Sequence, residues 1–232
     1  MEEVTSLWVF GYGSLVWKPG FQHGQTAVGH IEGLARRFWQ GNETHRGTPG
    51  RPGRVATLVE EAGSVTHGLA LELKGEEALD YLNNREMTLG GYRQQIATFH
   101  PSEKEIPSFP VLVFVATPQS KHWLGPACLQ SIAKQVVQSS GPSGHNVEYV
   151  IKLARWLRKT FPDVHDDHLY TIETHVMIEM TINNMDIDLL VGEDDDASTV
   201  ANASSAPLAA APSARASYSS SCTGKTLRCV KL

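Results

Sequence analysis

Apolar residues in the first half of the chain follow the patterns of short β-strands. In some segments they alternate with polar residues, and in others they form a short run that ends at a glycine; β-branched residues are frequent in both. The predicted strands are Leu7–Phe10, Arg54–Glu60, Val65–Leu73, Tyr92–His100 and Phe109–Thr117. We expect them to form one sheet or a small barrel.

A second pattern, with apolar residues three and four positions apart, predicts amphipathic helices. These are Glu76–Glu86, Leu129–Val137, Val147–Leu157 and His168–Met180. Strands therefore come first, with one helix between them, and the other helices follow. This order favours an α+β fold, or a barrel with helices packed outside it, over a doubly wound parallel sheet.

Both patterns stop near residue 182. Residues 193–196 read Glu-Asp-Asp-Asp, and the segment from there to Cys222 is mostly Ala, Ser and Pro. Such a composition buries too little apolar surface to offset the entropy of ordering. We predict one domain over residues 1–182 and an acidic, then Ala/Ser/Pro-rich disordered tail over 183–232. The last four residues, Cys229–Leu232, formally fit a prenylation motif, and an unmodified tail is the alternative.

Charge and composition narrow the possible partners and location. The net charge is −5, from 20 Lys and Arg against 25 Asp and Glu, and no basic block argues for nucleic-acid binding. The N-terminus is acidic where a secretory signal would be positive. No segment approaches the roughly 20 apolar residues of a membrane span. With only three scattered cysteines, we expect a cytosolic protein without stable membrane association.

The segment Gly11-Tyr12-Gly13-Ser14 directly follows the first predicted strand and is the first candidate site. Glycines can adopt positive φ angles that turn consecutive N–H groups inward, so such a loop can bind a carboxylate or a phosphate. The third glycine of a dinucleotide-binding motif and the lysine of a P-loop are absent. On the pattern alone, an ordinary turn is the alternative.

Glu86 is the second candidate because helical geometry places it among apolar residues. At 100° per residue it points within about 20° of Leu79, with Leu82 one turn away on the same side. It also lies at the end of the helix, where the macrodipole disfavours negative charge. Burial and dipole would both raise its pKa, as a general base near neutral pH requires. The alternative is an inward acid paired with Arg85 or another arginine.

Two further groups have simpler interpretations. His165-Asp166-Asp167-His168 has the residue types of a metal site, but it directly precedes a predicted helix, where Asp166 or Asp167 would be a good N-cap. Cys128 falls within a predicted helical segment and is interpreted as a small buried apolar residue. We predict no metal site.

Eight segments, in order from about residue 7 to about residue 170, resemble the ChaC family of γ-glutamyl cyclotransferases. They cover residues 8–17 (WVFGYGSLVW), 36–41 (RRFWQG), 45–47 (HRG), 52–55 (PGRV), 81–86 (YLNNRE), 89–92 (LGGY), 124–127 (LGPA) and 141–149 (GPSGHNVEY).

This resemblance implies a compact mixed β-barrel with flanking helices. It also implies an enzyme that cleaves glutathione into 5-oxoproline and cysteinylglycine without a cofactor. By matching positions, Glu86 would be the catalytic acid and base. Arg54 and Tyr149 are further candidates for the substrate pocket. The substrate-binding turn would consist of Val9, Phe10, Gly11, Tyr12, Gly13 and Ser14.

The chemistry of such a substrate fits these residues. The α-amine of a γ-glutamyl group can attack its own γ-carbonyl, so the protein must hold the substrate folded and move protons. A donor to the carbonyl oxygen is also needed, and Tyr12, Tyr149 or a backbone N–H are left open for this role. The alternatives are a cyclotransferase for other γ-glutamyl peptides or amines, and a non-catalytic regulatory module that binds partners through the tail.

Overall fold

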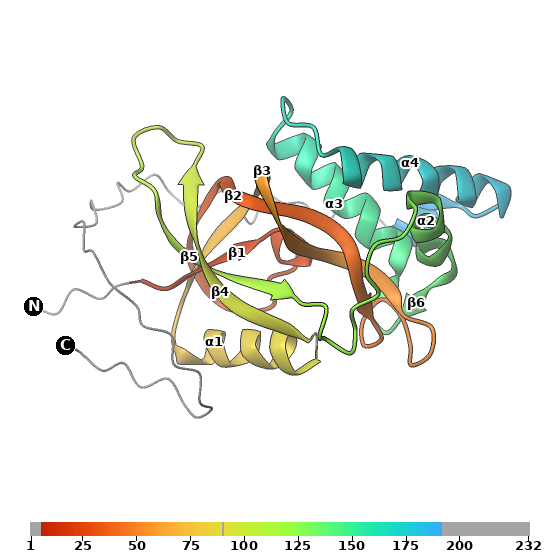
Figure 1. Cartoon of the computed structure of the whole chain (residues 1–232), viewed down its shortest axis with the longest axis horizontal. Coiled ribbons are helices and arrows are strands. Elements are labelled where there is room, and N and C mark those ends of the chain that lie inside the picture. Colours follow the sequence, from red (N-terminus) through yellow and green to blue (C-terminus); the bar gives the residue numbers. More distant parts are fainter. Residues whose placement is uncertain (1–5, 90, 192–232) are drawn as a thin grey trace, which may run out of the picture.

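The computed structural model describes residues 6–89 and 91–191, and five of its strands close into a barrel (Figure 1). The strands are β1 (Trp8–Gly11), β2 (His23–Asn42), β3 (Gly53–Leu73), β4 (Tyr92–Pro101) and β5 (Phe109–Ala116). Their order around the barrel is β1-β3-β2-β4-β5. β1 runs parallel to β5, with Val9 opposite Leu112, and the other neighbours are antiparallel. The predicted mixed barrel is therefore confirmed.

The long ribbon formed by β2 and β3 differs from the prediction. The two segments predicted as separate strands over 54–60 and 65–73 form one strand, β3, and its partner β2 was not predicted at all. β2 contains several glycines that interrupt its apolar alternation. One of them, Gly29, is required by a close approach, since a Cβ there would lie 2.2 Å from the carbonyl oxygen of His100. A strand packed this tightly needs glycine where the pattern of strands would have a side chain.

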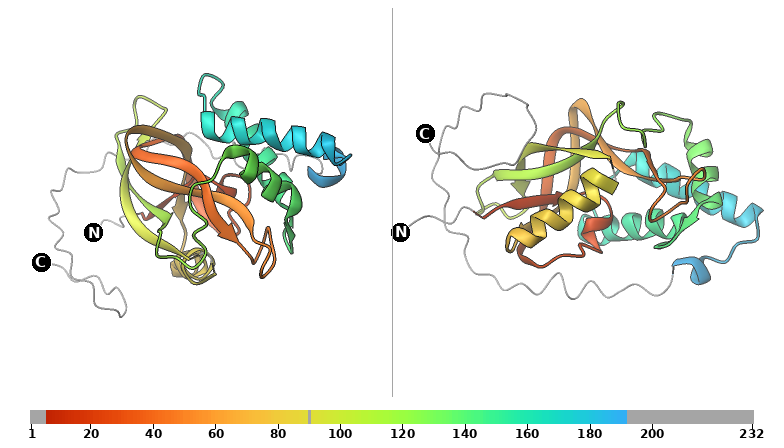
Figure 2. Two further views of the ribbon diagram at one scale, coloured as in Figure 1. Left: turned by 45° about the vertical axis from the view of Figure 1, so that its right-hand side comes forward. Right: turned by 90° about the horizontal axis from the view of Figure 1, so that it is seen from below.

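The helix between β3 and β4 covers one side of the barrel (Figure 2) and changes its winding along its length. It is α-helical over α1 (Glu76–Leu82) and π-helical over η2 (Asn83–Leu89). The prediction of a regular α-helix to Glu86 is thus wrong for its last turn. Because a π-helical turn holds about one residue more than an α-helical turn, the 100° spacing that aligned Glu86 with Leu79 does not apply there.

The other helices form a layer beside the barrel (Figure 2). They are α2 (Leu129–Gln138), α3 (Asn146–Thr160), α4 (Asp167–Ile182) and α5 (Ile187–Val191), with the short strands β6 (Ser140–Gly141) and β7 (Gly144–His145) before α3. Asp166 is the N-cap of α4, as predicted, and its side chain accepts from the backbone N–H of Leu169. Cys128, in contrast, is exposed just before α2, so its prediction as a buried residue is wrong.

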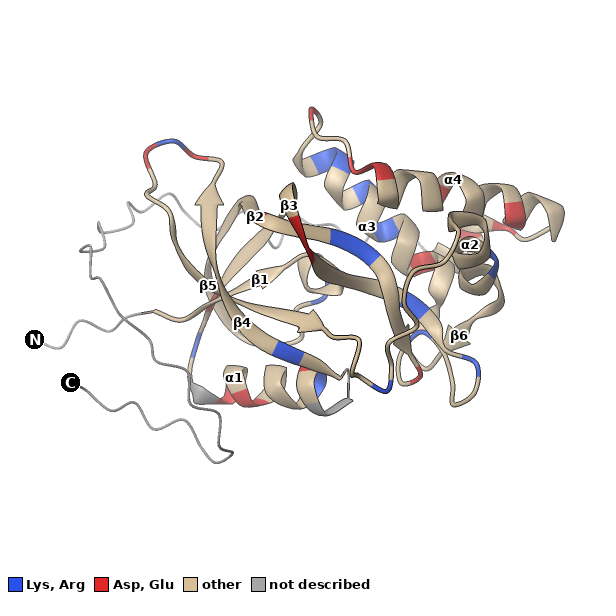
Figure 3. Ribbon diagram, in the orientation of Figure 1, with Lys and Arg blue, Asp and Glu red and all other residues tan. Residues whose placement is uncertain are grey.

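One apolar core runs from the barrel interior to the inner faces of α2, α3 and α4. The basic stretch in the middle of β2 (Figure 3) contains Arg36, which joins the two layers. Its side chain is 1% exposed, and its Nη1 lies 2.6 Å from the Asp166 carboxylate. Its Nε and Nη2 donate to the carbonyl oxygens of Tyr12 and His67. A single buried cation thus connects the turn after β1, the barrel and the start of α4.

The described fold continues beyond the predicted boundary at residue 182, because α5 places Val191 in the core. No helix within the described residues is long and apolar enough to cross a membrane. The acidic segment, the Ala/Ser/Pro-rich tail and the prenylation motif lie outside the described residues.

Candidate active site

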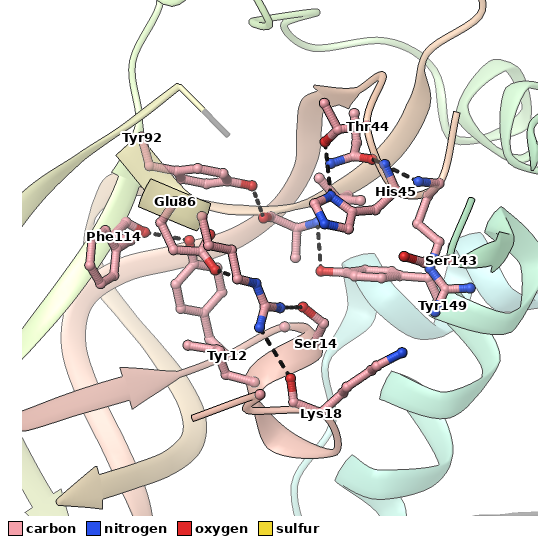
Figure 4. A pocket seen from close by; sticks show the side chains of 18 of the residues that line it. Tyr12, Ser14, Lys18, Thr44, His45, Glu86, Tyr92, Phe114, Ser143 and Tyr149 are labelled. Atoms are coloured by element: carbon pink, nitrogen blue, oxygen red, sulfur yellow. Dashed lines mark hydrogen bonds and ion pairs between the residues drawn. The ribbon is translucent and has the colours of Figure 1, made fainter. Parts of the chain in front are cut away.

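A cavity of about 300 Å³ lies where the end of β1, segment η2, the β2–β3 loop and α3 meet (Figure 4). The predicted residues Phe10, Tyr12, Gly13 and Ser14 line it from the end of β1. Glu86 lines it from η2, and Tyr149 from the first turn of α3. The fold therefore brings residues that are far apart in the sequence to one cavity.

The turn after β1 leads into a short 3-10 helix, η1 (Ser14–Val16), which begins after Gly13. Gly13 is needed for space, not for a positive φ, since its φ is −135°. A Cβ at this position would lie only 2.5 Å from the Tyr149 hydroxyl oxygen. Among the hydrogen bonds of the described residues, none has the backbone N–H of Gly13 or Ser14 as donor. The turn thus keeps two N–H groups available beside the cavity.

Arg85 holds this turn and Glu86 in a fixed relation. Its Nη2 donates to Ser14 Oγ at 2.7 Å, and its Nη1 donates to the carbonyl oxygens of Lys18 and Pro19. Its Nε lies 3.0 Å from Glu86 Oε1. Because Ser14 Oγ accepts from Arg85, the Ser14 hydroxyl proton remains available to a ligand.

Glu86 is the one acidic residue that lines the cavity, and its side chain is 16% exposed. Burial raises the pKa of its carboxyl above the usual value, whereas the neighbouring Arg85 guanidinium lowers it. A carboxyl with a raised pKa is a better proton acceptor than an exposed one. The alternative interpretation of Glu86 was an ion pair with Arg85. In the structure, Glu86 both pairs with Arg85 and lines the cavity.

Four tyrosines line the cavity. Tyr81 is exposed, and the hydroxyl groups of the other three, Tyr12, Tyr92 and Tyr149, differ in their hydrogen bonds. The Tyr12 hydroxyl donates to the carbonyl oxygen of Phe114, and the Tyr92 hydroxyl donates to that of Ala56. The Tyr149 hydroxyl instead accepts from the Ala56 backbone N–H at 3.2 Å. No acceptor for the Tyr149 proton is present among the described residues. Among these three, Tyr149 is therefore the tyrosine that can donate to a ligand.

The Tyr149 ring is held rigidly in this orientation. It makes edge-to-face contacts with Trp17 and Phe38, at centroid distances of 5.3 and 6.0 Å. Burial is the main cause that raises the pKa of Tyr149 to about 12, and the nearby Glu86 raises it further. The hydroxyl is thus protonated at neutral pH. Figure 4 shows it pointing into the space between Glu86 and Ser14.

The far side of the cavity is formed by the β2–β3 loop. Residues 45–47 of this loop contributed to the family resemblance, but none of them was predicted to be a site residue. Asn42 Oδ1 accepts from the backbone N–H groups of His45 and Arg46, and the Ser143 N–H donates to the His45 carbonyl oxygen. Burial lowers the pKa of His45, and the nearby cations Arg85, Arg46 and Lys18 lower it further. His45 is therefore a neutral hydrogen-bonding group at pH 7.

Three of the predicted site residues do not line the cavity. Val9 lies in the core, opposite Leu71 of β3. Gly11 also lies against β3, since a Cβ placed on it would be 3.5 Å from the Leu69 carbonyl oxygen. Arg54 is buried, with its guanidinium directed to Gln135 Oε1 and to the carbonyl oxygens of two other residues, Phe38 and Gly125. Its contacts join β2, helix α2 and the segment that precedes α2.

Within the described residues, no group of three or more His, Cys, Asp or Glu side chains is placed to hold a metal ion. The cavity's polar groups are hydrogen-bond donors, cations and one carboxylate. Together they can bind an anionic ligand and move a proton on it.

Comparison with known proteins covers nearly the whole described chain. Residues 7–179 match the family model described as ChaC-like protein. The glutathione-specific gamma-glutamylcyclotransferase 1 of Danio rerio is 47% identical over 176 residues, which is 75% of this chain and 90% of the relative. The protein of the same name from Homo sapiens is 45% identical over 170 residues, or 72% of this chain and 77% of the relative.

A solved structure agrees with these sequence relatives. The crystal structure of the yeast gamma-glutamyl cyclotransferase specific to glutathione has a TM-score of 0.67 at 28% sequence identity. The alignment covers 75% of this chain and 96% of the yeast chain. The similarity thus extends over most of this chain and nearly all of the yeast chain.

Proposed function

We propose, because this chain belongs to the ChaC family, that it is a γ-glutamylcyclotransferase that converts glutathione to 5-oxoproline and cysteinylglycine. The names of the relatives support glutathione as the substrate. The observation that carries the proposal is the position of Glu86, the cavity's one carboxylate, opposite a turn of free N–H groups and a free tyrosine proton.

The turn would hold the substrate by its α-carboxylate. The N–H groups of Gly13 and Ser14 and the Ser14 hydroxyl are the available donors on this side of the cavity. Hydrogen bonds to a charged acceptor are about twice as strong as neutral ones. Binding there would place the α-amino group of the same residue toward Glu86.

Glu86 would then move the proton that the reaction requires. Its carboxylate takes a proton from the α-ammonium, and the freed amine attacks the γ-carbonyl carbon to close a five-membered lactam. The bond between this carbon and the cysteine nitrogen breaks, and Glu86 returns the proton to that leaving nitrogen. The second proton that the ring nitrogen loses as the lactam forms is taken up by the released amine, which becomes an ammonium. One glutamate therefore acts first as base and then as acid.

Tyr149 would donate to the γ-carbonyl oxygen while negative charge develops on it. The sequence left Tyr12, Tyr149 and a backbone N–H as candidates for this role. The hydrogen bonds favour Tyr149, because the protons of Tyr12 and Tyr92 are already bonded to backbone carbonyls. A donor fixed in advance stabilises the transition state without reorganisation.

The deciding experiment measures 5-oxoproline and cysteinylglycine after incubation with glutathione, for the wild type and for Glu86→Gln. We expect the wild type to form both products in equal amounts. The variant should lose at least about 10³-fold in kcat because its amide cannot accept the proton. Its thermal midpoint should stay close to that of the wild type.

Two results would argue against the proposal. A Glu86→Gln variant that no longer folds would indicate that Glu86 has a structural role as the partner of Arg85. Faster turnover of γ-glutamyl-alanine than of glutathione would identify an enzyme for other γ-glutamyl peptides. The predicted cytosolic location and the role of the tail over 183–232 remain predictions.

A further inference from the structure

Lys18 is a cation of the cavity that has no acidic partner. Three cations line the cavity, and Arg85 is paired with Glu86 and Arg46 with Glu148. Within the residues that the structure describes, no carboxylate lies within ion-pair distance of Lys18. Glu148 is paired through its two oxygens with Arg46 and Lys152.

The backbone of Lys18 is fixed although its side chain is free. Its N–H donates to the Ser14 carbonyl oxygen at 2.8 Å, and its own carbonyl oxygen accepts from Arg85. Figure 4 shows the side chain extending away from Glu86, to the side of the cavity where Ser143 lies. Ser14 and Lys18, at opposite ends of one turn, thus serve different parts of the cavity.

Hydrogen-bonding groups line the cavity from two other segments. Thr44 and His45 line the cavity from the β2–β3 loop, and Ser143 lines it from the β6–β7 hairpin. The Thr44 hydroxyl lies 2.8 Å from His45 Nδ1, and the Ser143 N–H fixes the His45 carbonyl. The positive charge of Lys18 is one of the causes that lower the pKa of His45. These groups line the same cavity as Lys18 and add no negative charge to it.

We infer that Lys18, Thr44, His45 and Ser143 form a second carboxylate subsite, which binds the C-terminal carboxylate of the leaving dipeptide. This inference rests on the proposed function, in which the turn holds the first carboxylate and Glu86 lies at the reacting bond. Glutathione carries its second carboxylate two residues beyond that bond. The subsite makes the enzyme select γ-glutamyl tripeptides over shorter or uncharged γ-glutamyl compounds.

The test measures kcat and KM of the wild type and of Lys18→Met with three substrates. These are glutathione, its C-terminal glycinamide analogue, and γ-glutamylcysteine. We expect Lys18→Met to raise KM for glutathione about tenfold, the usual scale of a hydrogen bond to a charged group. The KM values for the amide and for γ-glutamylcysteine should change less than twofold, because neither places a carboxylate at the subsite.

A matched control separates a direct contact between Lys18 and the substrate carboxylate from the long-range attraction that any positive charge exerts on an anionic substrate. Lys104→Met removes the same charge from the exposed β4–β5 loop, outside the cavity lining, and should leave all three KM values unchanged. Glutathione and γ-glutamylcysteine have equal net charge. If Lys18→Met raised their KM values equally, Lys18 would act only through its field, and the inference would be overturned.

Two other outcomes are also decisive. A Lys18→Met variant with unchanged KM for glutathione overturns the subsite while the proposed function stands. A wild type that releases 5-oxoproline from none of the three substrates refutes the proposed function, and the subsite with it. Circular dichroism of the variant confirms that its KM is measured on folded protein.

Discussion

Tyr149 and Tyr92 provide two hydroxyl groups that reach the same cavity with opposite hydrogen-bond roles. Both contact the backbone of Ala56, Tyr92 as a donor to its carbonyl and Tyr149 as an acceptor from its N–H. Removing one oxygen atom from either ring changes the cavity almost equally in size and polarity. Only at Tyr149 does the change remove a proton that a substrate could receive.

We predict that Tyr149→Phe lowers kcat about 10²-fold with little change in KM, because a donor to the transition state is lost. Tyr92→Phe should lower kcat less than tenfold. Steady-state kinetics with glutathione checks both. A raised KM at unchanged kcat in Tyr149→Phe would contradict this role and indicate that Tyr149 binds a substrate carboxylate instead.

Sequence reasoning at the scale of single residues selected Glu86, Tyr149 and most of the turn, which line the cavity, but not the residues that hold them in place. Glu86 could be selected because a carboxylate among apolar positions is unusual. Arg85, next to it, was weighed only as its neutralising partner, although its contacts also fix the turn at Ser14. Lys18 lies in no pattern that was recognised and His45 only in a short matching segment, and neither was predicted as a site residue because its position at the cavity depends on tertiary contacts.

At the scale of elements, the turn between β1 and η1 depends on the helix it faces. Gly13 leaves room for the Tyr149 hydroxyl, which comes from the first turn of α3. The sequence indicated a glycine turn able to adopt positive φ. The structure gives a different reason for Gly13, which is the close approach of a side chain more than half the chain away.

We predict that Gly13→Ala destabilises the protein by about 1–3 kcal/mol, as overpacking usually does, because its Cβ would overlap Tyr149 Oη. In the double variant Gly13→Ala with Tyr149→Phe, the overlapping oxygen is gone and most of the stability should return. Urea unfolding measures both. Equal destabilisation in the single and double variants would place the conflict elsewhere in the turn.

Two elements show why the pattern of apolar positions was insufficient. β2 was missed because its glycines break the alternation, although one of them is required by the closeness of β4. The π-helical geometry of η2 was not predicted, because the helical spacing of apolar residues in α1 leads up to Glu86 without a visible break. A π-helical turn is fixed by packing at a site and leaves little trace in the sequence.

At the scale of the whole molecule, Arg36 is the charge that holds the layers together. Its guanidinium reaches the site turn at Tyr12, the barrel at His67 and the helical layer at Asp166. Arg54 has a similar supporting role between Phe38, Gly125 and Gln135. Sequence patterns could not separate such buried supporting arginines from arginines that bind a substrate.

We predict that Arg36→Met lowers the free energy of unfolding by about 3 kcal/mol, because it leaves the Asp166 carboxylate largely buried without its partner. The neighbouring Arg37 pairs with Glu61 at the surface, so Arg37→Met should cost about 1 kcal/mol or less. Chemical denaturation compares the two variants. Similar losses for both would show that the buried ion pair does not join the layers.

The parallel pairing of β1 with β5 has a consequence for how the chain folds during its synthesis. Val9 and its partner Leu112 are separated by nearly half of the 232 residues, and Tyr149 follows later still. Pairings this distant in sequence form slowly, because the intervening chain must first be ordered. A ribosome therefore has to release most of the polypeptide before the turn after β1 can reach its final place. Unfinished copies of this chain would therefore lack the assembled cavity.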